Sequence, residues 1–262
     1  MELLHSKIYS EELTTTPVLV FHGLFGMLDN WGNFAREFSA KFPVHLLDLR
    51  NHGKSFHSPE MSHEAMALDI LHYMDQKGIE KAILLGHSLG GKAVMHFALS
   101  YPDRVEKLVV VDMAPKSYPP HHQAIIHALQ SIKFEQDLGR KDVETKLVAQ
   151  GLDLSNVQFL AKSLFWKEPG LLDWRFNLEV LAAQYEDFVG AAIKTGVYHG
   201  PTLFVRGGKS QYVLDEDRIL LSQQFPSYQL ETVPGAGHWV HAENPKAFHE
   251  IVHDFLLGTL EG

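Results

Sequence analysis

The sequence predicts an α/β fold in which a mainly parallel sheet is covered by helices on both faces. Apolar runs of strand length alternate along the chain with amphipathic segments of helix length. A glycine-rich segment at 86–90 joins one such run to a helical pattern, as happens where a parallel strand reverses into a helix. The 262 residues, 45% of them hydrophobic, suffice for one large domain or for a core domain with an insertion.

Six apolar runs are predicted to be strands of the sheet. Nearly continuous apolar runs are typical of parallel strands, because both of their faces are buried. The predicted strands are Pro17 to His22, Pro43 to Asp48, Lys81 to Leu85, Lys107 to Asp112, Pro201 to Arg206 and Tyr228 to Val233.

Five segments between these strands have a helical pattern. They are Asn30 to Ala40, His63 to Lys77, Ser88 to Tyr101, Asp215 to Gln224 and Pro245 to Leu257. The last has the clearest start, with Asn244 as N-cap and a proline at the first helical position.

The alternation breaks between Ala114 and Thr195, where several helical patterns occur and no strand is predicted. We expect residues 116–195 to form a helical cap, or lid, inserted before the penultimate strand, and residues 1–115 and 196–262 to form the core domain. Most apolar side chains of the insertion should pack against one another, and a few should line a substrate pocket. The candidate pocket residues are Phe25, Trp166, Trp174 and Trp239.

Composition restricts the partners and the compartment. Lys and Arg number 23 against 32 Asp and Glu, a net charge of −9, and no basic cluster interrupts this balance. We therefore expect a small-molecule partner rather than nucleic acid or an anionic membrane. The absence of cysteine excludes disulfides, a cysteine nucleophile and thiolate metal sites. Neither a signal-like N-terminus nor an apolar run of about 18 residues occurs, so a cytoplasmic protein without a membrane span is expected.

The segment Gly86-His87-Ser88-Leu89-Gly90 has the pattern of a nucleophile elbow. Small neighbours on both sides allow a strand to reverse into a helix with Ser88 at the strained apex. The serine Oγ would be exposed at the helix N-terminus, and the amide of Leu89 would face the oxygen that becomes negative during acyl transfer. The alternative is a glycine-rich turn whose serine only caps the helix.

A serine nucleophile needs a histidine base, and His238 is the best of the 17 histidines. It lies in the loop Gly235-Ala236-Gly237-His238-Trp239, just past a predicted strand, at the edge where parallel strands present catalytic side chains. His87 precedes the nucleophile in the sequence, but its side chain should point away from the elbow. His241 is expected to be a packing or surface residue in the turn before the last helix.

A second oxyanion donor is expected in the loop Phe21-His22-Gly23-Leu24-Phe25-Gly26. The two glycines let the backbone approach a substrate, so the amide of Leu24 or Phe25 would act with that of Leu89. The alternative is an ordinary tight turn from strand to helix.

These features together resemble the α/β-hydrolase superfamily over nearly the whole chain, and more narrowly the bacterial YbfF-type esterases. The narrower resemblance rests on the motifs Val20 to Gly26, Leu47 to Gly53, Gly86 to Ala93, Val111 to Pro115 and Trp174 to Asn177. It implies the α/β-hydrolase fold, the order Ser, acid, His along the chain, and hydrolysis of carboxylic esters, with acyl-CoA thioesters as further substrates.

The acid of the triad departs from the superfamily's commonest pattern. In the loop Gly207 to Tyr212, Ser210 stands where an aspartate is usual, and a serine cannot hold an imidazolium by charge. Asp112, at the end of the preceding strand, could reach the same histidine, and the resemblance implies the same assignment. The alternatives are Asp215 and Asp217. If neither is the triad acid, both are interpreted as acids that complement the dipole at a helix N-terminus. Asp112 itself could merely end a strand.

Two further motifs are interpreted as non-catalytic. The segment His249-Glu250-Ile251-Val252-His253 fits the zinc-peptidase pattern H-E-x-x-H, but no histidine follows it and its histidines should lie on an outer helix face, so no metal is expected. In the segment Asp48 to Ser55, Asp48 and Arg50 are expected to tie loops together through charged hydrogen bonds.

The sequence as a whole predicts a serine esterase or thioesterase that works through an acyl-enzyme and needs no cofactor. Ser88 would attack the carbonyl, His238 would take its proton and Asp112 would orient the imidazole. Four cations of the insertion could meet a phosphorylated carrier such as CoA or simply be solvated: Lys116, Lys162, Lys167 and Arg175. The alternatives are a carbon-carbon bond hydrolase, a perhydrolase, a zinc peptidase and a non-catalytic ligand-binding module.

Overall fold

A seven-stranded sheet forms the centre of the computed structural model, which describes residues 2–259. The strands are β1 (Ser6–Tyr9), β2 (Val18–Phe21), β3 (Val44–Leu47), β4 (Ala82–His87), β5 (Val105–Val111), β8 (Thr202–Gly207) and β9 (Tyr228–Val233). Their order is β1-β3-β2-β4-β5-β8-β9, and every neighbouring pair is parallel except β1 with β3. The predicted mainly parallel sheet is confirmed.

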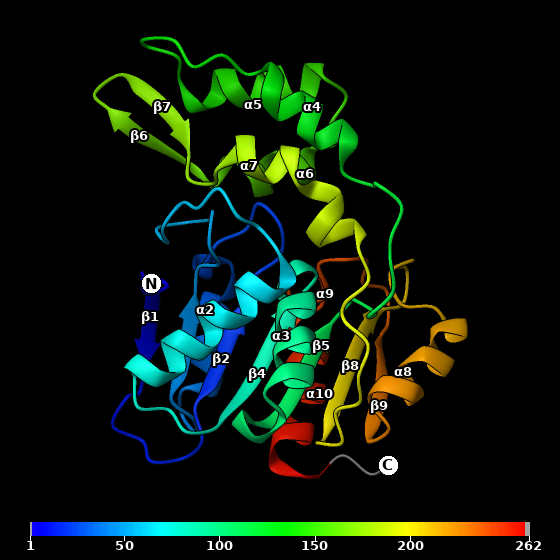
Figure 1. Cartoon of the computed structure of the whole chain (residues 1–262). Coiled ribbons are helices and arrows are strands. Elements are labelled where there is room, and N and C mark those ends of the chain that lie inside the picture. The colour runs from blue at the N-terminus through cyan, green and yellow to red at the C-terminus, as the bar shows by residue number, and fades with distance from the viewer. Residues whose placement is uncertain (1, 260–262) are drawn as a thin grey trace.

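Helices cover both faces of this sheet. They are α1 (Gly32–Phe38), α2 (His63–Gln76), α3 (Leu89–Ser100), α8 (Arg218–Gln224), α9 (Val240–Glu243) and α10 (Pro245–Leu257). Short 3-10 turns are η1 (Leu28–Trp31), η2 (Pro102–Arg104) and η4 (Asp215–Asp217). In Figure 1, α2, α3 and α8 lie in front of the sheet and α10 lies behind it. None of the helices within residues 2–259 is long and apolar enough to cross a lipid bilayer.

The strands divide their side chains between two cores, because successive residues of a strand point to opposite faces. On β4, Leu84 packs in the core under α2 and α3, whereas Ile83 and Leu85 pack in the core under α1 and α10. On β5, Val110 and Val109 divide in the same way. Burial on both faces explains why these strands read as continuous apolar runs.

The six predicted strands and five predicted helices all form, with ends that shift by a few residues. The last helix has the predicted bounds, and the side chain of its N-cap Asn244 accepts a hydrogen bond from the amide of Ala247. Outside the segment between β5 and β8, one strand and one α-helix were not predicted. The edge strand β1 is four residues long and only partly buried, and α9 is a single turn, so neither has a clear periodic signal.

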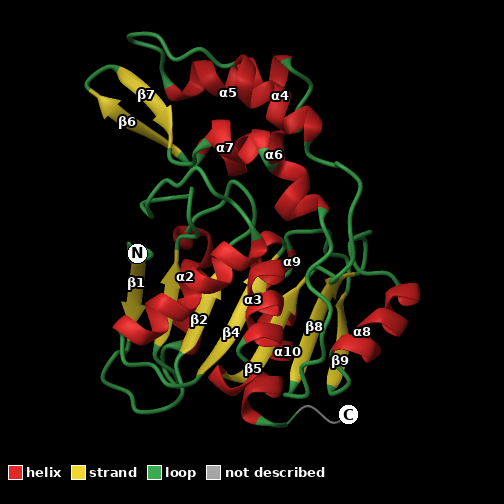
Figure 2. Ribbon diagram, viewed as in Figure 1, coloured by secondary structure: helices red, strands yellow, loops and turns green. Residues whose placement is uncertain are grey.

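The segment between β5 and β8 is not purely helical, which corrects the expectation that it contains no strand. It forms α4 (Gln123–Ser131), α5 (Arg140–Ala149), α6 (Leu154–Ala161), β6 (Leu164–Glu168), β7 (Leu171–Trp174), α7 (Leu178–Ala183) and a π-helical turn, η3 (Glu186–Gly190). Strands β6 and β7 make a separate antiparallel hairpin beside the helices (Figure 2). Pro169 and Gly170, the latter with φ of 80°, form its two-residue turn, and Pro-Gly is a dipeptide that marks turns in a sequence.

Buried Lys92, on α3, ties this inserted segment to the core. Its side chain is fully buried, and its Nζ donates to the carbonyl oxygens of Lys116 and Val189 at 3.2 and 2.8 Å and to that of Ala191. Burial lowers the pKa of Lys92 to about 7. One side chain therefore contacts the chain both where it enters the inserted segment and where it leaves.

Several imidazoles are buried in a neutral form. Burial lowers the pKa of His22, His45 and His63 to about 4 and the pKa of His52 and His241 to about 3. In the unfolded chain the same groups take up protons near pH 6.5. The unfolded state therefore binds more protons than the folded state between about pH 6.5 and pH 4.

We expect the free energy of unfolding to fall as the pH is lowered from 6.5 toward 4, since the folded state resists protonation in that window. Each such histidine contributes up to about 1.4 kcal/mol per pH unit below pH 6.5, which is about 2 kcal/mol between pH 7 and pH 5, so the five together should lose on the order of 10 kcal/mol. Urea unfolding at a series of pH values measures it, and unfolding at pH 5.5 should take up protons. A flat or rising free energy over this range would contradict the prediction.

Candidate active site

The turn between β4 and α3 carries Ser88 in a strained conformation. Ser88 has φ of 52°, a value that non-glycine residues rarely adopt, and it immediately precedes the first residue of α3. A Cβ on Gly86 would lie 2.2 Å from the carbonyl oxygen of Gly90, and a Cβ on Gly90 would lie 2.5 Å from that of Phe21. Both glycines are therefore required by close backbone contacts, as a nucleophile elbow demands.

Asp112 and His238 meet next to this turn. Asp112 follows β5, is fully buried and has φ of 49°, and its Oδ2 accepts a hydrogen bond from His238 Nδ1 at 2.7 Å. This bond leaves His238 Nε2 as the free nitrogen of the ring, the arrangement that a general base needs. His238 keeps part of its side chain exposed to the cavity described below.

Ser210 contacts Asp112 instead of replacing it. Its Oγ donates to Asp112 Oδ2 at 2.5 Å, and the amide of Gly207 donates to Asp112 Oδ1 at 3.1 Å. The rival acids lie elsewhere: Asp215 is exposed and pairs with Arg206, and Asp217 pairs with Lys116. The carboxylate of Asp112 thus holds three hydrogen-bond donors, of which sequence reasoning identified only the histidine.

Two rings hold the imidazole of His238. Tyr212 stacks on it with ring centroids 3.8 Å apart and an interplanar angle of 17°. His87 packs against it at 4.8 Å, and His87 Nε2 bonds to the backbone oxygen of His238 at 2.8 Å. Neither residue was predicted as part of the site, because nothing in a sequence shows which aromatic ring will stack on a given side chain.

The backbone amides near Ser88 distinguish the two oxyanion candidates. The amide of Phe25 donates to His52 Nε2 at 3.2 Å, so it is already engaged. The amides of Leu24 and Leu89 have no hydrogen-bond partner within the described part of the chain. Leu24 and Leu89, rather than Phe25, are the free donors beside the serine.

His22 and His52 position the loop that carries Leu24. Nδ1 of His22 donates to the carbonyl oxygen of Gly23 at 2.8 Å, and its Nε2 accepts from the amide of Leu49 at 3.1 Å. His52 repeats the arrangement, with Nδ1 donating to the carbonyl oxygen of Arg50 at 2.9 Å. Both rings must be neutral to donate at one nitrogen and accept at the other, which agrees with their lowered pKa values.

The segment after β3 makes the charged hydrogen bonds that were predicted for Asp48 and Arg50. The carboxylate of Asp48 accepts from the amides of Leu28 and Lys54 at 2.7 and 2.9 Å. The guanidinium of Arg50 makes two hydrogen bonds to the buried carboxylate of Asp69, at 2.5 and 2.8 Å. These contacts join the segment after β3 to Leu28 of η1 and to Asp69 of α2.

A cavity of about 350 Å³ contains Ser88 and His238. Phe25 and Trp239 line it, as expected, together with Ile125, Phe159 and Leu160 of the inserted segment. Trp166 and Trp174 do not line it. Trp166 is half exposed on β6, and Trp174 is buried against Phe134 and Phe176. Both tryptophans lie on the hairpin of β6 and β7 and not at the cavity, and the sequence analysis, which predicted no strand there, could not show this.

The remaining histidines do not form a metal site. Within residues 2–259, no group of three or more histidine, aspartate or glutamate side chains could hold a metal ion. His249 packs edge-on against Phe34 and Phe38 and is only partly exposed, so the expectation of an outer-face position is wrong for this residue. His241 is a packing residue that stacks on Trp31 with centroids 4.1 Å apart.

Comparisons with known proteins agree with this geometry. A family model described as the alpha/beta hydrolase fold matches residues 16–245. Esterase YbfF of Escherichia coli (strain K12) is 40% identical over 243 residues, which are 92% of this chain and 93% of the esterase. The sn-1-specific diacylglycerol lipase ABHD11 of Mus musculus is 38% identical over 251 residues, with 92% and 81% covered. A solved marine microorganism esterase has a TM-score of 0.93 and 36% identity, with 97% and 99% covered.

Proposed function

This chain belongs to the α/β-hydrolase family and is a carboxylic ester hydrolase, and from that premise we propose that Ser88, His238 and Asp112 carry its reaction through an acyl-enzyme. One observation carries the proposal. Ser88 stands on a strained turn in the same cavity as His238, whose Nδ1 is bound by a buried carboxylate. A nucleophile, a base and an orienting acid in one cavity are what acyl transfer to water requires.

In the proposed reaction, His238 Nε2 takes the proton of Ser88 as its Oγ attacks the ester carbonyl. Asp112 keeps the proton on Nδ1 and stabilises the imidazolium that forms. The imidazolium then protonates the leaving alcohol, and water, activated by the same histidine, hydrolyses the acyl-enzyme. No step needs a cofactor.

We assign the oxyanion hole to the amides of Leu24 and Leu89. Both lack a partner within the described residues, whereas the amide of Phe25 is held by His52. Free N–H groups that are already in place stabilise a developing oxyanion without reorganisation during the reaction.

We also propose that residues 116–195 act as a cap over the core domain formed by residues 1–115 and 196–262. Side chains of α4 and α6 line the catalytic cavity, and Phe159 of α6 packs on Trp239 of the core at 5.3 Å. Such a cover excludes water and offers apolar surface to an acyl chain.

Thioesters of a phosphorylated carrier are a further candidate substrate class. Three of the four cations of the insertion are engaged: Lys116 and Lys167 pair with aspartates, and Arg175 lies over the ring of Phe165. Lys162 instead lines a second cavity with Lys7 and Arg36, and this cavity shares Trp31 and His241 with the catalytic one. A phosphorylated leaving group would reach cations there.

We expect p-nitrophenyl esters to be hydrolysed with an optimum at short to medium acyl chains, below about ten carbons, because 350 Å³ is near the lower end of small-molecule sites. The measurement compares kcat/KM for acetate, butyrate, octanoate and palmitate esters, and then for acetyl-CoA against acetyl-pantetheine.

The controls separate the parts of this proposal. A higher kcat/KM for acetyl-CoA than for acetyl-pantetheine would support the thioester candidate if Lys162→Ala removes the difference. Equal kcat/KM for the two thioesters would reject it. Fastest hydrolysis of palmitate would contradict the size argument. Absence of turnover with every ester would favour another hydrolytic chemistry, such as carbon-carbon bond cleavage or perhydrolysis, or a ligand-binding role.

A further inference from the structure

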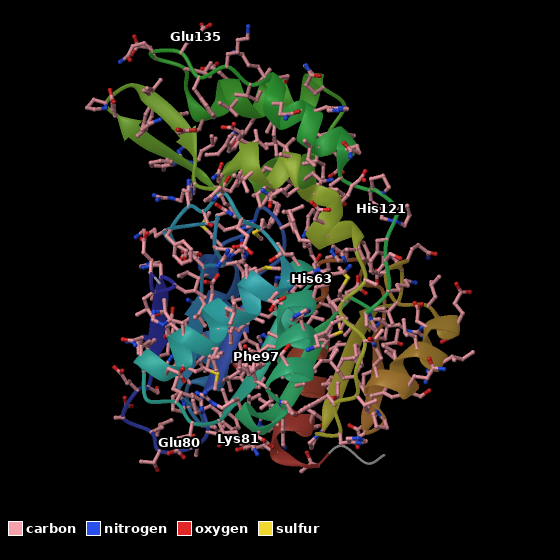
Figure 3. All side chains as sticks on the ribbon, in the orientation of Figure 1. His63, Glu80, Lys81, Phe97, His121 and Glu135 are labelled. Carbon is pink, nitrogen blue, oxygen red and sulfur yellow. The ribbon has the colours of Figure 1, made fainter. Side chains whose placement is uncertain are left out.

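Several imidazoles line the catalytic cavity, and that of His122 has no role in the proposed reaction. His122 precedes α4 and lines the cavity that holds Ser88 and His238. Its neighbour His121 also lines this cavity, and Figure 3 labels His121 on the connection that enters the inserted segment. His122 and the reacting groups Ser88 and His238 therefore line one cavity.

One nitrogen of His122 is fixed by a tyrosine. His122 Nδ1 lies 2.7 Å from the hydroxyl of Tyr185, which is a buried residue between α7 and η3. Burial raises the pKa of Tyr185 to about 12, so its hydroxyl keeps its proton, and no other described group accepts from it. Tyr185 therefore donates to Nδ1.

This bond determines where the proton of His122 lies. Burial lowers the pKa of His122 to about 4, so the ring is neutral at neutral pH and carries a single proton. Because Nδ1 accepts from Tyr185, that proton lies on Nε2. Nε2 has no hydrogen-bond partner within residues 2–259 and is not fully enclosed, and the residue lines the cavity, so its N–H is free to bond a ligand there.

We propose that His122 forms a polar subsite in which Nε2–H donates a hydrogen bond to an oxygen atom in the alcohol part of the ester. The inference rests on the proposed ester hydrolysis. Ile125, Phe159 and Leu160 suit an apolar acyl chain, whereas a fixed N–H donor in such a cavity is satisfied only by a substrate oxygen or by water. The substrate class is an ester whose alcohol carries a second oxygen.

The test compares esters of butyric acid whose alcohols have the same number of heavy atoms. One pair is 2-hydroxyethyl against propyl, and the other is 2-methoxyethyl against butyl. The readout is the ratio of kcat/KM within each pair, compared between wild type and variants, so that the intrinsic reactivity of the esters cancels.

We expect His122→Phe to lower both ratios about five- to tenfold, the value of one hydrogen bond. His122→Gln keeps a donor and should retain part of the selectivity, which guards against a variant that fails to fold. His127→Phe, an exposed histidine on the same helix, is the matched control and should leave both ratios as in wild type. Ratios unchanged in His122→Phe would overturn the proposal.

Tyr185→Phe tests the role of the tyrosine as a positioning residue. Without its hydroxyl the ring can place its proton on either nitrogen, and an unprotonated Nε2 can still accept from the 2-hydroxyethyl group but not from the 2-methoxyethyl group. We expect the 2-methoxyethyl ratio to fall and the 2-hydroxyethyl ratio to be largely kept, and an equal fall in both would contradict the fixed tautomer.

Failure of the proposed function has a different signature. It would appear as absent hydrolysis of the propyl and butyl esters by the wild type, whatever the variants do. In that case the dissociation constants of the four esters are measured for wild type and His122→Phe. Their ratio within each pair then tests the subsite in the way that the kcat/KM ratios would.

Discussion

Ser88→Ala should lower kcat for ester hydrolysis on the order of 10⁶-fold, because the acyl-enzyme cannot form without its oxygen. The fold should survive, since Ser88 Oγ has no hydrogen-bond partner within the described residues and the backbone strain at this position is unchanged by the substitution. Steady-state hydrolysis of p-nitrophenyl butyrate, with a thermal melt of the same sample, measures both effects.

The matched control is Ser100→Ala, at the other end of the same helix. Ser100 Oγ donates to the carbonyl oxygen of His96, far along α3 from the elbow, so this variant should keep full activity. Retention of turnover in Ser88→Ala at more than a few per cent of wild type would mean that another group performs the attack.

Asp112→Asn should lower kcat on the order of 10⁴-fold with a similar loss in kcat/KM. The amide oxygen can still accept from Gly207, but the amide nitrogen then faces His238 Nδ1 and donates to it. That hydrogen bond moves the ring proton to Nε2, which leaves no lone pair to take the proton of Ser88. The loss comes from the wrong tautomer rather than from a displaced ring.

Asp215→Asn and Asp217→Asn are the controls for this assignment. Asp215 is exposed and bound to Arg206, and Asp217 pairs with Lys116 at 2.7 Å, so neither reaches His238. Both variants should keep kcat close to wild type. A severe loss in either, with activity retained in Asp112→Asn, would show that the acid has been misassigned.

The fold was predictable where periodicity and length agree. Strands buried on both faces produce the apolar runs that predict the sheet, and the N-cap Asn244 followed by proline marks the last helix. The hairpin of β6 and β7 was missed because its apolar residues, such as Leu164 and Leu172, read equally well as part of a helix.

The candidate site was predictable where chemistry restricts residue type. Only a glycine fits the contacts of Gly86 and Gly90, so the elbow is visible in the sequence, and the order of strands brings Asp112 and His238 to one edge. Contacts between distant loops have no such signal. The amide of Phe25 is taken by His52, and Tyr212 stacks on His238, through packing that depends on the whole fold.

The contacts of Lys92 affect the order in which parts of this protein unfold. By binding carbonyl oxygens at residues 116, 189 and 191, the ammonium holds together the two ends of a long stretch of chain, as a cross-link would. The pairing of β5 with β8 closes this loop, and the contacts of Lys92 narrow it further, so the conformational entropy of closure is not lost again each time the stretch opens. We therefore expect amide hydrogen exchange to show local opening of the stretch above the sheet while the helix that begins beside Ser88 stays protected.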